Sequence, residues 1–277
     1  MTIPMQWALR RRMMMSALGS GIDVAALSIT YTGTHTDYGM VTMSDGARYR
    51  LLAFTSSGTL SIEQPVNCEV CVVGGGANGA KATSSGGGDG GAGAYLKNQF
   101  VPAYNGGSVV VGARQGVSSI ADVSVNAVSG RNGGTGAGGL TVGTGDGISK
   151  YPFEDTGYSL WAGKPHCAGG GAGGGSYYIG DDSWESFVYG DGGSNGSNGS
   201  AQTYQGTENA PGGSGGLYGG GNGGKAMAGQ HNGTNATYYG SGGGGGAYEH
   251  YYSASIGSVG VGYQGIIYIR IPEEQAA

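Results

Sequence analysis

The sequence predicts a mainly β and irregular fold, in which a small β-module is followed by a bundle of polyglycine II helices with exposed aromatic loops. Two features of composition predict it: 65 of the 277 residues are Gly and only 11% are charged, against about 7% and about 25% in ordinary globular chains. The third observation is position, because the glycine-dense tracts lie between residues 74 and 246 and strand-like sequence flanks them. We therefore divide the chain into a docking segment (residues 1–25), a β-module (residues 26–73, completed by residues 256–273) and a glycine-rich domain (residues 74–255).

The first 25 residues have helical propensity from Gln6 through Leu18 and contain Trp and Met residues that we expect to be exposed. Such side chains in a short polar segment are typical of a contact with a partner, and a frayed terminus is the alternative. The candidate docking residues are Trp7, Arg10, Arg11, Arg12 and Met13. Gly19 and Gly21 interrupt the apolar run after the arginines, so we expect no secretion signal. The sequence has no stretch of about 18 apolar residues, so we predict no membrane span.

The β-module is predicted from short runs rich in β-branched, aromatic and aliphatic residues, separated by Gly, Ser, Asp and Asn. These runs cover residues 27–32, 39–43, 49–54, 59–62 and 68–73. A matching run at residues 258–271 closes the chain, and we expect the two ends to share one sheet. Cys68 and Cys71 lie three residues apart in one run, where strand alternation points their side chains to opposite faces. They are therefore predicted to pack in the core rather than to pair or bind a metal.

The glycine-dense region is divided into seven tracts of similar length. They cover residues 74–79, 86–93, 130–139, 169–175, 190–199, 212–224 and 240–246. Several keep a period of three, as at Gly130, Gly133, Gly136 and Gly139, which is the period of polyproline II geometry. Such helices have no internal hydrogen bonds, so their backbone groups must bond to neighbouring segments, and the absence of Cβ atoms allows that approach. A set of flexible Gly/Ser linkers is the alternative, and collagen is excluded because only seven residues are Pro.

Aromatic residues in the loops between tracts are the candidate binding residues, because Tyr and Trp offer large contact areas at low entropic cost. If each tract crosses the bundle once, the loop containing residues 109–111 returns to the β-module, and three later loops reach the far tip. The candidate receptor-binding residues in those loops are Tyr151, Phe153, Tyr158, Trp161, Tyr204, Tyr248, Tyr251 and Tyr252. Caps that cover the bundle ends are the structural alternative. One miscounted tract would instead favour Trp184, Phe187, Tyr178 and Tyr239.

Catalytic and cofactor sites are weakly indicated. The spacing Gly74-x-Gly76-x-x-Gly79 follows an apolar run, as in dinucleotide-binding folds, but no helix is predicted after it. Acidic residues among aromatics could serve glycoside cleavage or remain solvated; they are Glu154, Asp155, Asp181, Asp182 and Glu185. We predict no enzyme activity, no metal and no cofactor. The net charge of −5 argues against a nucleic-acid surface.

Four segments together resemble the glycine-rich domain of bacteriophage tail proteins. They are residues 49–60 (YRLLAFTSSGTL), 70–76 (VCVVGGG), 109–113 (VVVGA) and 265–270 (GIIYIR), and the likeness spans about residues 48–271. The resemblance implies a tail-fibre adhesin in which distal loops on a polyglycine II bundle recognise a bacterial surface glycan or protein. It also implies a virion location, assembly in the host cytoplasm and contact with other tail proteins through the N-terminal segment. A structural tail or capsid decoration protein is the alternative, an ice-binding or extracellular scaffold is a third, and a homo-oligomer remains open.

Overall fold

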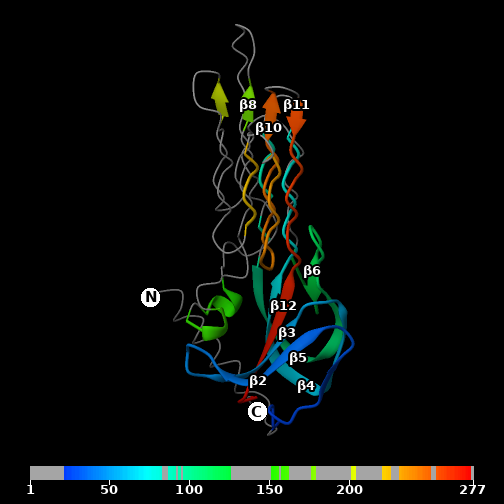
Figure 1. The fold of residues 1–277 in the computed structure, drawn as a ribbon. Helices are drawn as coiled ribbons and strands as arrows, with labels where there is room; N and C mark the ends of the chain where they lie inside the picture. The colour runs from blue at the N-terminus through cyan, green and yellow to red at the C-terminus, as the bar shows by residue number, and fades with distance from the viewer. Residues whose placement is uncertain are drawn as a thin grey trace.

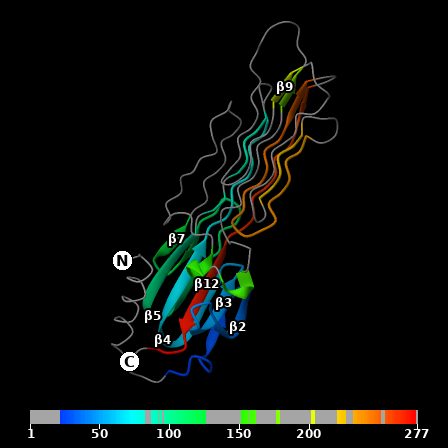
Figure 2. The same ribbon diagram turned by 90° about the vertical axis from the view of Figure 1, so that its left-hand side faces the viewer.

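The computed structural model describes residues 22–82, 87–91, 93–94, 96–125, 151–155, 157–161, 176–178, 201–203, 220–225, 231–250 and 254–275. The molecule is elongated, with a large sheet at one end and a small sheet at the other, joined by extended segments of the glycine tracts (Figures 1 and 2). The predicted docking residues Trp7, Arg10, Arg11, Arg12 and Met13 lie outside the described residues.

The large sheet has eight strands, and every pairing in it is antiparallel. They are β1 (Ile29–Tyr31), β2 (His35–Thr42), β3 (Arg48–Phe54), β4 (Gly58–Val73), β5 (Leu96–Val110), β6 (Ser118–Ile120), β7 (Val123–Val125) and β12 (Ile266–Pro272). The order is β2-β3-β12-β4-β5-β6-β7, and β1 pairs with β4 off this path. Strand β12 lies between β3 and β4, so the two flanks of the glycine region share one sheet, as the sequence suggests.

The module differs in detail from the predicted ranges. The runs at residues 59–62 and 68–73 form a single strand, β4, with register shifts opposite β5 between Ser61 and Cys68. The run at residues 258–271 is a strand only from Ile266, because residues 257–265 bond instead to the glycine tracts. Strands β5 to β7 also belong to this sheet, although they lie within the range assigned to the glycine-rich domain.

Both faces of the sheet are buried at its centre. Leu52 and Phe54 of β3 pack into one core cluster, whereas Leu51 and Ala53 pack into a second cluster on the opposite face. The same alternation places Cys68 in the first cluster and Cys71 in the second, and both side chains are buried. The prediction of core packing on opposite faces is therefore confirmed. A strand buried on both faces is expected to read as a nearly continuous apolar run, as β12 does.

Residues 240–247 bond to neighbouring glycine-tract segments with a period of three. The carbonyls of residues 240, 243 and 246 accept hydrogen bonds from residues 94, 91 and 88, and those of residues 241, 244 and 247 accept from residues 263, 260 and 257. The carbonyls of residues 242 and 245 accept from residues 221 and 224. A β-strand would change neighbour every second residue, so these lateral bonds follow a different geometry from that of the sheets.

These segments require glycine because neighbouring backbones approach closely, and not because their φ angles exclude other residues. A Cβ atom on Gly244 would lie 1.9 Å from the carbonyl oxygen of Asn222, and one on Gly245 would lie 1.8 Å from that of Gly88. Among the described glycines of the predicted tracts, Gly240 has a positive φ, of 71°. The missing Cβ atoms therefore let the segments pack backbone against backbone.

The small sheet lies at the far end from the large one (Figures 1 and 2). Its strands are β8 (Ser176–Tyr178), β9 (Ala201–Thr203), β10 (Tyr248–His250) and β11 (Ala254–Ile256), in the order β11-β10-β8-β9. Strand β10 pairs in parallel with β8 and antiparallel with β11. The far end is thus assembled from segments widely separated in the sequence.

The described residues confirm a mainly β and irregular fold. They contain two short 3₁₀ helices, η1 (Pro152–Glu154) and η2 (Ser159–Trp161), and no α-helix. After the Gly74-x-Gly76-x-x-Gly79 spacing the chain continues without a helix through residue 82, unlike a dinucleotide-binding turn. Within the described part of the chain, no helix is long and apolar enough to cross a membrane.

Candidate binding surfaces

The far end holds one of the predicted receptor-binding residues, Tyr248, in strand β10. Strand β8 places Tyr178, a member of the alternative set, directly opposite His250 of β10. Tyr204 follows β9, and Tyr251 and Tyr252 connect β10 to β11, but all three lie outside the described residues. The described far end therefore contains residues from both of the sets that the sequence analysis gave as alternatives.

The predicted placement of Tyr151, Phe153, Tyr158 and Trp161 at the far tip is wrong. Phe153 is only 7% exposed and packs in the second core cluster, with Tyr151 and Tyr158 partly buried against it. Trp161 ends η2, in the same short segment. In Figure 1 this segment, drawn in green, lies beside the large sheet.

Arg270 of β12 explains why Phe153 stays at the sheet end. Its Cζ atom lies 4.4 Å from the centroid of the Phe153 ring and 4.6 Å from that of Tyr49, both within the range of cation–π attraction. Its Nη2 donates a 2.7 Å hydrogen bond to Oε2 of Glu69, and Nε donates to the same oxygen at 3.1 Å. Because the guanidinium is buried and paired, Phe153 covers a structural ion pair.

Asp155 fixes the same segment to the loop after β2. Its carboxylate accepts hydrogen bonds from the hydroxyl and backbone N–H of Ser44 and from the backbone N–H groups of Gly157 and Tyr158. Burial alone would raise the pKa of Asp155, but these hydrogen bonds outweigh it and lower the pKa below its ordinary value. The contacts of this carboxylate are those of a structural anchor for the loop.

The assumption that each glycine tract crosses the bundle once does not hold between Val125 and Tyr151. Val125 belongs to β7 of the large sheet, and Tyr151 packs against the second core cluster of the same sheet. The prediction placed Tyr151 at the opposite end from Val125, whereas the described residues place both at the large sheet. Tyr239 also packs against that cluster, at the sheet end.

A tyrosine cluster that the sequence reasoning missed lies where the large sheet meets the glycine tracts. The Tyr239 ring meets the Tyr263 ring at a centroid distance of 5.5 Å and the Tyr238 ring at 5.8 Å, both edge to face. Burial is the main cause that raises the pKa values of Tyr238 and Tyr239, and neighbouring tyrosines, including Tyr38, add to it. Tyr38 and Tyr263 keep about two fifths of their surface exposed, at 40% and 38%. The adjacent pair Tyr238-Tyr239 just before a glycine tract was the available sequence signal.

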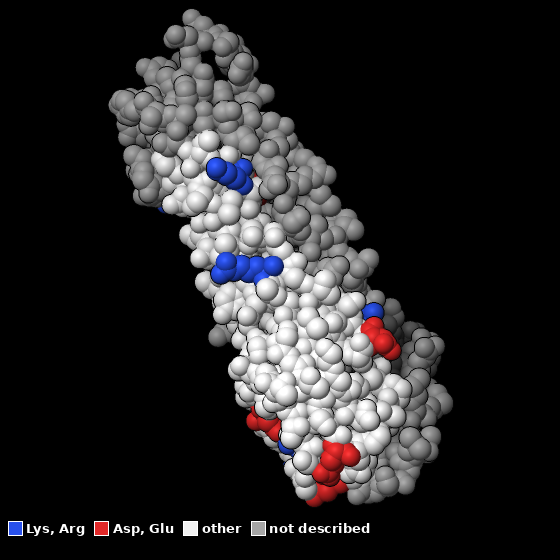
Figure 3. All heavy atoms as spheres, turned by 90° about the vertical axis from the view of Figure 1, so that its right-hand side faces the viewer, with Lys and Arg blue, Asp and Glu red and all other residues white. Residues whose placement is uncertain are grey.

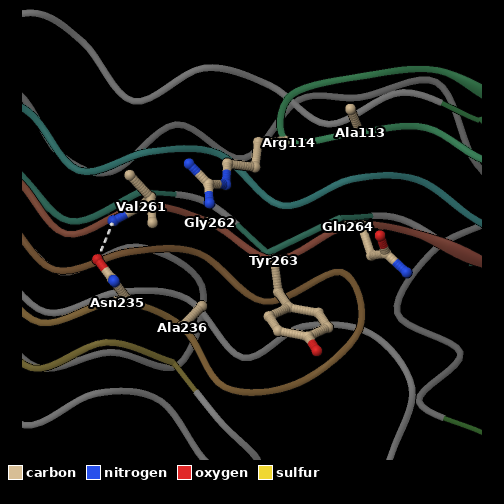
Figure 4. A pocket seen from close by; sticks show the side chains of 8 residues that line it. All are labelled: Ala113, Arg114, Asn235, Ala236, Val261, Gly262, Tyr263 and Gln264. Carbon is tan, nitrogen blue, oxygen red and sulfur yellow. Dashed lines mark hydrogen bonds between the residues drawn. The ribbon is translucent and has the colours of Figure 1, made fainter.

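A pocket of about 350 Å³ opens beside this cluster. Its lining residues come from three segments and are Ala113, Arg114, Asn235, Ala236, Val261, Gly262, Tyr263 and Gln264. Figure 4 shows the 261–264 segment between the Arg114 turn on one side and Asn235 and Ala236 on the other. The pocket therefore combines a guanidinium, an aromatic ring and two amides.

Charge is unevenly distributed along the molecule. On the face in Figure 3, Lys and Arg side chains lie over the glycine-tract half, and Asp and Glu side chains gather towards the sheet end. In the described tract segments and the turn beside them, the exposed basic residues are Lys81, Arg114 and Lys225, and the carboxylate of Asp89 is 2% exposed. The described surface of these segments therefore offers positive charge to a ligand, although the whole chain is acidic.

Other sequence candidates gain no site. In the part of the chain that the structure describes, no three His, Cys, Asp or Glu residues are grouped as a metal site would require. The acidic candidates Asp181, Asp182 and Glu185 lie outside the described residues.

Comparison with known proteins adds no family to this description. No protein-family model matches the chain, and no curated protein matches it significantly.

Proposed function

We propose that the chain is a receptor-binding adhesin of a bacteriophage tail, in which a polyglycine II bundle carries a recognition surface at the end away from the large sheet. The observation that carries the proposal is the bonding of residues 240–247, whose carbonyls reach three neighbouring segments in rotation. A helix of three residues per turn presents successive carbonyls to three sides. The rotation of acceptors among three neighbours therefore supports the proposal of polyglycine II.

Backbone bonding makes this bundle a scaffold for variable loops. The segments approach through positions where a Cβ atom would collide with a neighbouring carbonyl, as at Gly221 and Gly260, where the distance would be 1.9 and 1.8 Å. Because the packing uses backbone atoms, the connecting segments at the far end are free to differ without loss of the core. Loops on a rigid support are the usual location of binding residues.

Recognition is assigned to the far end, and attachment to the opposite end. Tyr177 and Tyr178 belong to β8, and Tyr248 belongs to β10, the strand that pairs with it. Aromatic residues are suited to recognition because they offer large contact areas. The resemblance to tail glycine-rich domains supports a bacterial surface glycan or protein as the ligand. The N-terminal segment, with Trp7, Arg10, Arg11, Arg12 and Met13, would attach the protein to other tail proteins in the virion.

A cell-binding assay tests the proposal. The purified protein should bind intact host bacteria and compete with adsorption of the phage. Tyr248→Ala in β10 should reduce binding, whereas Tyr38→Ala, an exposed tyrosine of β2 at the sheet end, should leave it unchanged. A protein that neither binds cells nor competes, but is lost from virions when residues 1–25 are deleted, would be a structural tail or capsid decoration protein instead.

A further inference from the structure

The pocket beside Arg114 has features that neither the scaffold nor the far-end surface explains. It lies at the junction of the tight turn after β5, the segment before Gly240 and the segment that leads into β12. Its volume of about 350 Å³ is at the lower end of the range of small-molecule pockets, about 300–1,000 Å³. This size suits a monosaccharide or disaccharide.

Arg114 is held in place by its backbone while its side chain stays available. The N–H of Gln115 donates to the carbonyl of Gly76 at 3.0 Å, and the N–H of Gly75 donates back to the carbonyl of Gly116 at 3.0 Å. These bonds fix the turn to the tract. The Arg114 side chain is exposed and has no ion pair with any residue that the structure describes. In Figure 4 it extends over Gly262 towards Val261.

The other polar groups of the pocket are oriented by hydrogen bonds. Oδ1 of Asn235 accepts from the N–H of Val261 at 3.0 Å, which leaves the Asn235 amide NH₂ as a donor. Nε2 of Gln264 donates to the carbonyl of Thr55 at 3.0 Å, which leaves Oε1 of Gln264 as an acceptor. The Tyr263 ring is 38% exposed and is supported by Tyr239 at 5.5 Å.

We infer that this pocket binds an acidic saccharide, a sugar that bears a carboxylate. The Arg114 guanidinium pairs with the carboxylate in a bidentate manner, and the Tyr263 ring packs against the apolar face of the sugar ring. The amides of Asn235 and Gln264 bind hydroxyl groups, which both donate and accept. Exposed Lys81 and Lys225 on the same half add attraction at longer range.

A nucleic acid is disfavoured as the ligand because the pocket contains a single basic residue and the chain carries a net charge of −5. The inference does not depend on the proposed adhesin function, because the pocket lies at the side of the molecule near the large sheet. A structural virion protein could carry the same site.

Titration calorimetry of the purified full chain with digalacturonate tests the inference, with neutral digalactose of the same linkage and inorganic phosphate as comparison ligands. Digalacturonate should bind saturably, and the two comparison ligands should not. Arg114→Gln should weaken binding about tenfold or more, because a charge-assisted bidentate contact is lost. Tyr263→Ala should weaken it as well. Lys225→Gln, which removes the same charge outside the pocket, should change affinity by less than about twofold.

Besides competition by phosphate, three results would overturn the inference. They are the absence of saturable digalacturonate binding, an Arg114→Gln variant that binds as the native protein does, and an equal loss in Lys225→Gln, which would reveal charge attraction without a site. Competition by phosphate would reassign the pocket to phosphate and would also overturn it. Unchanged thermal unfolding of Arg114→Gln establishes that a loss of binding is local.

Discussion

Replacing Gly244 by Ala should destabilise the protein far more than an alanine substitution normally does. The new Cβ would lie 1.9 Å from the carbonyl oxygen of Asn222 and 2.4 Å from its carbonyl carbon. Ordinary van der Waals contact begins at 3.4 Å, so the segment carrying Asn222 must move by about 1.5 Å, the difference between 3.4 and 1.9 Å. Both contacting atoms are backbone, so no side-chain rotation can relieve the clash.

That movement breaks lateral hydrogen bonds. On either side of Asn222, the N–H of Gly221 donates to the carbonyl of Gly242 and the N–H of Gly224 donates to the carbonyl of Gly245, both at 2.9 Å. A separation increased by about 1.5 Å takes both distances beyond hydrogen-bonding range. At about 1–3 kcal/mol for each of the two broken bonds, the expected loss in the free energy of unfolding is about 2–6 kcal/mol.

Gly46→Ala provides the matched control. Gly46 has a φ of 79°, and its Cβ would meet nothing within 4 Å, so the substitution costs only the strain of a left-handed residue, about 1–2 kcal/mol. Chemical denaturation of both variants, followed by circular dichroism and by tyrosine fluorescence, measures the two losses. A loss in Gly244→Ala no larger than that in Gly46→Ala would refute the reasoning from close approach.

Three further predictions concern the large sheet. Arg270→Met should lower the free energy of unfolding by about 3–5 kcal/mol, because it removes the guanidinium that pairs with the buried carboxylate of Glu69; adding Glu69→Leu should recover more than half of that loss in a double-mutant cycle, and no recovery would contradict the role of the ion pair. Asp155 has a lowered pKa, so the stability it contributes is present above its unfolded pKa of about 3.9 and is lost as pH falls through the folded value. Asp155→Asn should therefore cost about 2 kcal/mol at pH 7, and pH-dependent unfolding should show this gap shrinking in acid; an equal gap at about pH 2 would argue against a carboxylate anchor. Cys68, whose pKa burial raises to about 12, and Cys71 should resist a thiol reagent in the native protein and react after unfolding; peptide mass spectrometry distinguishes these cases, and native labelling of either residue would contradict their burial.

The sequence predicted well the features that depend on local alternation. The opposite faces of Cys68 and Cys71 follow from the period of two in a strand, and the run from Ile266 to Ile271 reads as a central strand because both of its faces are buried. The lateral hydrogen bonds of residues 240–247 also repeat every third residue. The tract in which the sequence shows a period of three, residues 130–139, lies outside the described residues.

Features that depend on contacts between distant residues could not be predicted in the same way. Phe153 lies at the sheet end because its ring contacts the guanidinium of Arg270, which is distant in the sequence. Asp155 likewise accepts a hydrogen bond from Ser44, which is also distant in the sequence. Neither contact leaves a periodic signal in the sequence. The pocket has the same origin, since Arg114, Asn235 and Tyr263 come from three separate segments.

Amide hydrogen exchange across residues 240–247 tests the central claim most directly, because a bonded glycine scaffold and a chain of flexible glycine linkers differ most at these backbone groups. All seven carbonyls from residue 241 to residue 247 accept hydrogen bonds, and the N–H groups of Gly243 and Gly246 donate to Ala77 and Ala80. We therefore expect these amides to exchange nearly as slowly as those of β12. Exchange of these amides at the rate of an unstructured peptide would contradict the account.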